Sequence, residues 1–264
     1  MTTHIGQLMD LKGKTALISG GAGHLGYAMA EALAEVKGSI ILLDKDASVL
    51  RTKAQALSKK WKVKVTPLAL DLTDSDAVLR LSKSLKQLDI LIHSAALVGT
   101  SDLKGWAVPF ERQDIDTWRR ALEVNLTAVF ALTQALYPLL KKSKQGSVIS
   151  IGSIYGMLGP DMSLYEGTSM GNPAAYAASK GGLLQLTRWM AASLAPDVRV
   201  NSISIGGVMR GHKDPFLSRY LKKTPLKRMA TEDDIKGAAV YLASGLSKYV
   251  TGHNLVLDGG LSIW

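Results

Sequence analysis

The sequence predicts the α/β class, with helices covering both faces of a doubly wound parallel sheet in three layers. Short apolar runs of strand type alternate with longer helical segments along all 264 residues. The strand runs are continuously apolar, as expected for strands buried on both faces of a parallel sheet. No linker, repeat or low-complexity stretch interrupts this alternation. We therefore expect one domain over residues 1–264, with its cofactor half at about 1–150 and its catalytic and substrate elements at about 151–264.

The expected elements follow a polar lead-in at residues 1–13. Strands are expected at residues 14–19, 39–43, 63–70, 89–92, 147–151, 198–205 and 254–257. Helices are expected at residues 27–37, 46–60, 74–85, 113–141, 173–194 and 231–243, the third of them with Thr73 as its N-cap. In such sheets, ligands bind at the carboxyl ends of the strands, so the polar residues that follow each strand should meet at one edge.

Composition excludes several kinds of protein. The chain has no cysteine, which rules out disulfides, thiolate zinc sites and cysteine nucleophiles, and its five histidines show no metal-ligand spacing. No run approaches the ~20 apolar residues of a membrane span, and the N-terminus lacks the apolar core of a signal peptide. We therefore expect a cytoplasmic protein that does not enter a membrane.

The net charge of +10 raises the question of nucleic-acid binding. The lysines, however, are scattered singly along helical segments, and no tract combines clustered cations with interleaved aromatic residues. A solvated basic surface, or attraction of an anionic small molecule, explains the charge better. We expect a small-molecule substrate and no nucleic-acid partner.

A glycine-rich turn directly follows the first strand. Gly21, Gly23 and Gly26 satisfy G-x-G-x-x-G between a strand and a helix, where glycines let the backbone approach a pyrophosphate at the helix N-terminus. Asp44 ends the next strand, 18 residues beyond Gly26, where a carboxylate can accept hydrogen bonds from both adenosine ribose hydroxyls. It would repel a 2′-phosphate, although Lys45 could offset that repulsion. The turn predicts a dinucleotide cofactor, with NAD favoured over NADP.

A serine, a tyrosine and a lysine suggest proton chemistry. Ser153 follows an apolar strand, and Tyr176 and Lys180 lie four residues apart in a helical segment, hence on one face. A neighbouring ammonium should lower the pKa of the phenol, making it a usable acid and base, while the serine hydrogen-bonds the reacting oxygen. The spacing alone is weak, because Tyr137 and Lys141 share it and are interpreted as packing. Taken alone, Tyr176 would be better interpreted as a surface or interface tyrosine. Because the glycine-rich turn predicts a cofactor that carries hydride, we interpret Tyr176 instead as part of a site that interconverts an alcohol and a carbonyl.

These features belong to an ordered set of motifs by which the chain resembles the short-chain dehydrogenase/reductase family over almost its whole length. The resemblance implies a Rossmann fold of the short single-domain type. The motifs, in chain order, are SGGAGHLG (19–26), DLTD (71–74), HSAA (93–96), Asn125 in EVNLTAVF, Ser153, YAASK (176–180), RVNSISIGG (199–207) and LVLDGG (255–260).

The resemblance implies a role for each matching residue. Tyr176 would be the catalytic acid and base, Lys180 would lower its pKa and bind the nicotinamide ribose, and Ser153 would orient the substrate oxygen. Asn125 would hold a water in a proton relay, the alternative being an amide that stabilises a kink in its helix. The cofactor would contact Gly20, Gly23, His24, Leu25, Gly26, Asp44, Asp71, Leu72, Ser94, Ala95, Ala96, Tyr176, Lys180, Gly206 and Val208.

Four positions depart from the family pattern. His24 stands in place of a glycine, and His93 opens HSAA where the family has NNAG. Ile205 replaces a proline, and Arg210 replaces a threonine near the cofactor phosphates. These departures bear on cofactor geometry and affinity more than on the fold.

The segment between Ser153 and Tyr176 holds 22 residues, more than is usual in the family. The extra residues, about 158–171, should loop over the strand ends, where loops often carry specificity. Their side chains could hydrogen-bond a polyhydroxylated substrate, with a subunit contact as the alternative. The candidates are Tyr165, Glu166, Thr168 and Ser169.

A second variable region, residues 210–228, should form a substrate lid. Its cations could recognise phosphate or carboxylate at the pocket mouth, or could be a solvated helix face. Arg210 is the candidate substrate contact; the others are His212, Lys213, Arg219, Lys222, Lys223, Lys227 and Arg228. The long loop and the DGGLSIW ending also resemble bacterial members that make surface-polysaccharide or flagellar sugars.

The prediction is an oxidoreductase that transfers hydride between NAD(H) and a secondary alcohol or ketone, on a sugar or other polyhydroxylated substrate that could be phosphorylated. The alternatives are an epimerase or dehydratase with transient oxidation, and a catalytically silent dinucleotide-binding protein. The helix at 176–194 mixes small and large apolar residues. That mixture is consistent with the helix pairing by which family members form dimers and tetramers, so we expect a homo-oligomer.

Overall fold

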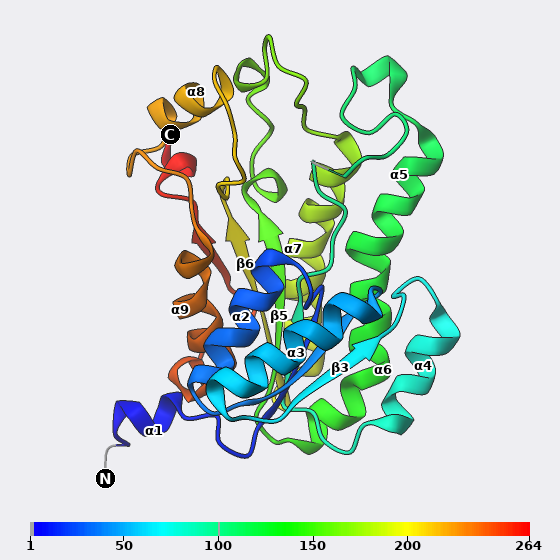
Figure 1. Cartoon of the computed structure of the whole chain (residues 1–264), viewed down its shortest axis with the longest axis vertical. Helices are drawn as coiled ribbons and strands as arrows, with labels where there is room; N and C mark the ends of the chain where they lie inside the picture. The colour runs from blue at the N-terminus through cyan, green and yellow to red at the C-terminus, as the bar shows by residue number, and fades with distance from the viewer. Residues whose placement is uncertain (1–2, 100) are drawn as a thin grey trace.

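The computed structural model describes residues 3–99 and 101–264, and it contains one seven-stranded, all-parallel sheet (Figure 1). The strands are β1 (Thr15–Ser19), β2 (Ser39–Asp44), β3 (Val65–Ala69), β4 (Ile90–His93), β5 (Gly146–Ser153), β6 (Val198–Ile205) and β7 (Asn254–Leu257). Their order across the sheet is β3-β2-β1-β4-β5-β6-β7. The chain therefore builds outward from β1 in one direction, returns, and builds outward from β4 in the other. The predicted doubly wound sheet is confirmed.

The helices lie close to their expected positions. They are α1 (Ile5–Met9), α2 (His24–Glu35), α3 (Ala47–Trp61), α4 (Ser75–Ser84), α5 (Ile115–Leu122), α6 (Ala128–Lys142), α7 (Ala174–Leu194), α8 (Phe216–Lys223) and α9 (Glu232–Ala243). The predicted cap of α4 is wrong by one residue, because Asp74 and not Thr73 accepts from the Ala77 N–H. The lead-in also holds the short helix α1. Every helix in the described ranges is too short or too polar to cross a lipid bilayer.

Alternate residues of each strand face opposite layers of helices, because side chains in a strand project with a period of two. On β1, Ala16 and Ile18 pack into a core with α2, α3 and α9. Leu17 packs into a second core with α4, α6 and α7. The same split on β2, β4, β5 and β6 explains why these strands have no polar face.

The long helix expected at 113–141 is interrupted. The five residues Glu123–Thr127 form a π-helical turn between α5 and α6. A π turn carries one residue more than an α turn needs, and such turns often occur at functional sites. Here the turn directs the side chain of Asn125 into the protein, where it is almost fully buried.

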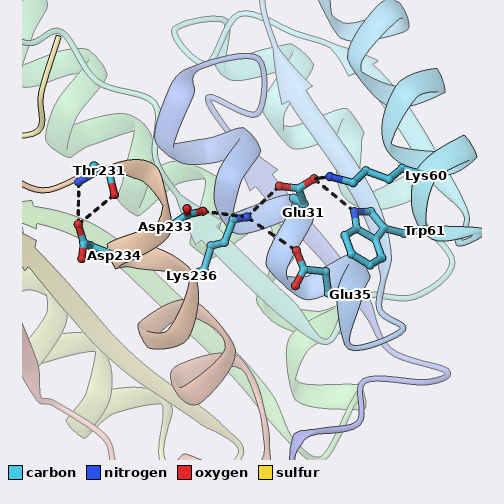
Figure 2. Close-up of polar contacts among 8 residues, drawn as sticks. All are labelled: Glu31, Glu35, Lys60, Trp61, Thr231, Asp233, Asp234 and Lys236. Carbon is cyan, nitrogen blue, oxygen red and sulfur yellow. Dashed lines mark hydrogen bonds and ion pairs between the residues drawn. The ribbon is translucent and has the colours of Figure 1, made fainter. Parts of the chain in front are cut away.

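A polar network joins three helices on one face of the sheet (Figure 2). Lys236 on α9 lies 3.0 Å from a carboxylate oxygen of Glu31 on α2. The other oxygen of Glu31 lies 2.8 Å from Lys60 Nζ on α3 and accepts from Trp61 Nε1 at 3.3 Å. Because α2 starts at the glycine-rich turn, these contacts hold that turn in a fixed position relative to α9.

Candidate active site

One cavity of about 970 Å³ opens at the carboxyl ends of the strands. It is lined by the glycine-rich turn, the ends of β2, β3 and β4, Ser153, Tyr176 and the loop after β6. Every predicted cofactor residue lines it, and so do the two predicted substrate contacts, Tyr165 and Arg210. Of the predicted catalytic residues, only Asn125 lies outside it. The sheet edge thus brings together residues that are far apart in the chain.

Two glycines of the turn are required by close packing. Gly20 has a φ of +66°, and a Cβ there would lie 2.6 Å from the amide nitrogen of Ala95. A Cβ on Gly26 would lie 2.2 Å from the carbonyl oxygen of Gly20. Gly23 is the N-cap of α2 and offers no side chain to its first-turn N–H groups. These N–H groups, at the positive end of the helix dipole, fit a dinucleotide pyrophosphate.

Acidic and basic side chains both line the end of the cavity beside β2 and β3. One Asp44 oxygen accepts from Ala22 N at 3.1 Å and the other from Lys45 N at 2.8 Å. The N–H and hydroxyl of Thr73 lower the pKa of the Asp71 carboxyl. Carboxylates suit the ribose hydroxyls, but Lys45 and Arg120 also line the cavity and suit a 2′-phosphate. The charges at this end therefore do not single out NAD over NADP.

At the catalytic end, Ser153 closes β5 and Tyr176 lies in the first turn of α7. The Ser153 Oγ accepts from Tyr155 N at 3.2 Å, and its hydroxyl lies beside the Tyr176 phenol, whose pKa it lowers as a hydrogen-bond donor. Lys180 Nζ lies 5.7 Å from the Tyr176 ring centroid and donates to the Ile151 carbonyl at 2.7 Å. Burial lowers the pKa of the Lys180 ammonium to about 8.

The expectation that Lys180 lowers the pKa of Tyr176 is wrong for this structure. Burial raises the pKa of the Tyr176 hydroxyl, with only the Ser153 hydroxyl acting in the opposite direction. The ammonium is engaged with the Ile151 carbonyl instead of the phenol oxygen. The cost of desolvating a phenolate therefore dominates here.

Asn125 connects three segments behind the cavity. Its Oδ1 accepts from Leu97 N at 2.7 Å, and its Nδ2 donates to Leu97 O at 3.0 Å and Ser179 Oγ at 3.1 Å. The amide thus holds the loop after β4 and helix α7 against the π turn. These contacts join other segments and are not bonds within its own helix, so they differ from the kink-stabilising alternative, and the role in a water relay stays a prediction.

The histidines of the glycine-rich turn and of β4 differ in their surroundings. His93 is fully buried, bonds Thr133 Oγ1 at 2.8 Å, and has its pKa lowered by burial to about 3, so it is a neutral structural group. His24 Nδ1 lies 3.6 Å from Glu232 Oε1. The same oxygen lies 2.9 Å from Arg210 Nη1. Arg210 thus reaches the cavity with its charge already paired.

The inserted loop 158–171 packs against α8, at the top of Figure 1. The rings of Tyr165 and Phe216 lie 5.5 Å apart. Arg219 on α8 donates to the carbonyls of Ser163 and Glu166 in the loop, at 3.1 and 2.5 Å.

Other cations of the predicted lid are also engaged in pairs within the protein. Lys223 pairs with Asp161, and Arg228 pairs with Asp234. Apart from Arg210 and His212, the basic residues of 210–228 do not line the main cavity. The lid cations therefore mainly hold the lid and the inserted loop in place.

The cavity residues that were not predicted as site residues include Tyr155, Asn172 and Tyr220. Tyr155 follows Ser153 by two residues, and Asn172 directly precedes Pro173, the N-cap of α7. Their place next to a predicted strand end and a predicted helix start was the available signal.

The cavity lies where the strand order reverses, between β1 and β4, which is where doubly wound sheets bind nucleotides. Fold and cavity together define a doubly wound α/β protein with a cavity at its switch point. The family model described as "Enoyl-(Acyl carrier protein) reductase" matches residues 20–262. The chain belongs to the short-chain dehydrogenase/reductase family, whose members it also resembles in fold.

Two similar relatives and one solved structure illustrate the range of this family. The chain is 33% identical over 264 residues to trans-4-hydroxycyclohexanecarboxylate dehydrogenase of Sinomonas cyclohexanicum, covering 94% of this chain and 92% of that protein. It is 28% identical over 256 residues to post-translational flagellin modification protein A of Campylobacter coli, covering 95% and 98%. A gluconate 5-dehydrogenase from Burkholderia cenocepacia, in complex with NADP and tartrate, superposes with a TM-score of 0.87 at 26% identity, covering 99% and 100%.

Proposed function

We propose that this protein transfers hydride between a nicotinamide dinucleotide and a secondary alcohol or ketone of a polyhydroxylated substrate, with Tyr176 as acid and base. The observation that carries the proposal is the shared cavity: Ser153, Tyr176 and Lys180 line the same space as the glycine-rich turn. Family membership supports the general class of dehydrogenase or reductase.

The cofactor, when bound, supplies or accepts the hydride. The Tyr176 hydroxyl exchanges a proton with the substrate oxygen, and the O–H of Ser153, which lies beside this phenol, turns to donate to the same oxygen. A Lys180 ammonium with a pKa of about 8 can gain or lose a proton near neutral pH and so restore the proton on the phenol. The nicotinamide ribose hydroxyls would lie beside Lys180, and the remaining predicted cofactor residues would hold the dinucleotide.

For the cofactor we propose NAD(P), with Asp44 favouring NAD and with Lys45 and Arg120 able to accept NADP. The NADP complex of the Burkholderia cenocepacia enzyme supports the second possibility.

For the substrate we propose a sugar or related polyol. The basic lid offers little support for a phosphorylated substrate, because Arg210, Lys223 and Arg228 pair with carboxylates of the protein. Trp189 on α7 is 57% exposed, which suits the proposed homo-oligomer. A cytoplasmic location stays a prediction.

The test is turnover of secondary alcohols and polyols, followed through the absorbance of the reduced nicotinamide. Tyr176→Phe should lower kcat by about 10²–10⁴-fold while the cofactor dissociation constant stays the same. Tyr137→Phe is the matched control, because Tyr137 and Lys141 have the same spacing on α6 outside the cavity. If Tyr176→Phe turns over substrate like the wild type, the proposed mechanism is wrong.

A further inference from the structure

The side chain of Asn172 is a buried polar group with no partner in the protein. It is 9% exposed, and neither its Oδ1 nor its Nδ2 makes a hydrogen bond to another protein atom. It nevertheless lines the main cavity. Leaving a buried amide unpaired is costly, so buried asparagines are nearly always satisfied, if not by protein then by something bound beside them.

Two tyrosine hydroxyls lie beside this amide. Tyr155, from the turn after Ser153, and Tyr165, from the inserted loop, hydrogen-bond each other with 2.7 Å between their oxygens. The Asn172 amide approaches both phenols and acts on each in the manner of a hydrogen-bond donor, opposing the effect of burial on its pKa, but neither contact has hydrogen-bond geometry. The Tyr176 hydroxyl is also near enough to raise the pKa of Tyr155 and Tyr165. The three polar groups therefore converge next to the proposed catalytic phenol.

The side chains of Asn172, Tyr155 and Tyr165 can together both donate and accept hydrogen bonds. In a pair of phenols one hydroxyl donates to the other, so one O–H proton and several acceptor lone pairs remain free. The amide of Asn172 adds two N–H donors and a carbonyl acceptor. A ligand that uses this set must itself donate and accept. An alcohol hydroxyl does both, whereas a carboxylate or phosphate oxygen only accepts.

We infer that Asn172, Tyr155 and Tyr165 form a subsite that binds a neutral hydroxyl on the carbon adjacent to the reacting carbon of the substrate. The inference rests on the proposed function for the position of the reacting carbon, and it narrows the substrate class to vicinal diols. It makes Asn172 a specificity-determining residue.

The charges around the subsite favour a neutral ligand over an anion. Arg210, a cationic side chain of the cavity wall on the predicted substrate lid, is already paired with Glu232. Burial and the neighbouring Arg210 lower the pKa of His212, which keeps that imidazole neutral. An acyl chain would also be a poor occupant, because an apolar group there would leave the Asn172 amide unpaired.

A matched pair of probes isolates the proposed contact: vicinal cyclohexanediol, in its cis and trans forms, and cyclohexanol. They share a ring and a secondary alcohol and differ by one adjacent hydroxyl. With NAD⁺ and with NADP⁺, the wild type should show a kcat/KM for at least one diol about tenfold or more above that for cyclohexanol.

Asn172→Leu should lower kcat/KM for the diol by about tenfold or more and that for cyclohexanol by less than about threefold. Tyr165→Phe should have an intermediate effect. Met162→Leu is the control, because this exposed residue of the same loop does not line the cavity. Asn172→Leu should keep the wild-type melting temperature, since no protein hydrogen bond is lost, and Asn172→Ser provides a smaller substitution at the same position.

A binding measurement separates this inference from the proposed activity. Saturation-transfer NMR would follow binding of the diol to Tyr176→Phe loaded with reduced cofactor, with and without Asn172→Leu. Loss of the diol signal in the double variant supports the subsite even if no alcohol is turned over, in which case only the proposed activity fails. If the wild type turns over the diol and cyclohexanol equally well, and Asn172→Leu does the same, the proposed subsite is wrong and the proposed activity stands. Absence of turnover together with an equal diol signal in both variants overturns both.

Discussion

The ammonium of Lys180 donates to the carbonyl oxygen of Ile151, with 2.7 Å between the two atoms, in the buried wall of the cavity. Burial lowers its pKa from 10.5 to about 8. Between these two pH values the unfolded chain holds a proton that the folded protein has released, so stability rises with pH in this window. At lower pH the buried charge costs stability throughout.

Lys180→Met should therefore raise the free energy of unfolding near neutral pH by about 1–2 kcal/mol, a figure that allows for the lost hydrogen bond to Ile151. The free energy of unfolding of this variant should also rise less toward higher pH than that of the wild type. Turnover should fall by about 100-fold or more. Urea unfolding at several pH values measures the first effect, and cofactor absorbance the second. Lys141→Met is the control, because Lys141 is an exposed lysine paired with Asp197. A destabilised Lys180→Met protein would contradict the prediction.

Asp44 should set the balance between the two cofactors. Replacing it with serine removes the negative charge beside the adenosine ribose, while Lys45 and Arg120 remain. The ratio of kcat/KM for NADP⁺ to that for NAD⁺ should rise about tenfold or more, since the carboxylate would repel a 2′-phosphate. The control is Asp76→Asn, in the first turn of α4 and outside the cavity wall. An unchanged ratio in Asp44→Ser would show that the ribose end lies elsewhere.

Arg219 should act on substrate affinity through the inserted loop. Its guanidinium holds two loop carbonyls against α8, so Arg219→Met should loosen the loop that carries Tyr165. The KM for the substrate should rise about threefold or more with the cofactor dissociation constant unchanged. Lys222→Met, an exposed change on the same helix, should leave both constants as they are. A shift confined to the cofactor constant would refute this role.

Glu31 should make stability sensitive to acid. Hydrogen bonds from Lys60, Lys236 and Trp61 outweigh burial and lower the pKa of its carboxyl from 4.5 to about 2. The resulting stabilisation is complete above the unfolded pKa and is lost as the pH falls from about 4.5 toward 2.

Glu31→Gln should lower the free energy of unfolding at neutral pH by about 1–2 kcal/mol and reduce its loss over that acid range. Chemical unfolding at neutral and acid pH measures both. Asp116→Asn breaks an exposed pair with Arg119, whose side chains are 83% and 72% exposed, and should change stability by less than about 0.5 kcal/mol. Equal acid sensitivity of Glu31→Gln and wild type would rule out the assigned role.

Local patterns in the sequence predicted the elements that carry the cofactor site. Continuous apolar runs identified the strands, and a glycine turn followed by Asp44 identified one end of the cavity, because both depend on neighbours in the chain. The break in the helix at 113–141 was missed, since a π turn adds a residue without a composition signal. The N-cap of α4 was assigned to Thr73 instead of Asp74 because both residue types favour that position.

The errors at the site come from contacts between distant segments. The sequence spacing placed Lys180 beside Tyr176, but it could not show that the Ile151 carbonyl binds the ammonium or that burial dominates the pKa of the phenol. The basic lid suggested an anion because its acidic partners, such as Asp161 and Glu232, lie in other parts of the chain. The position of Asn172 before a predicted helix start was a signal that was missed, but its unpaired amide could be recognised only once its surroundings were known.

The π turn at Glu123–Thr127 constrains how this part of the chain can change in length. Because the wider turn absorbs the surplus residue, deleting one residue there would restore regular α-helical bonding and leave α5 and α6 in nearly the same phase. Ala121 could then stay buried beside Ala175 of α7, but the hydrogen bonds from Asn125 to the loop after β4 depend on the bulge and would be lost. Shortening the segment should therefore spare the two helices and release the loop that Asn125 anchors.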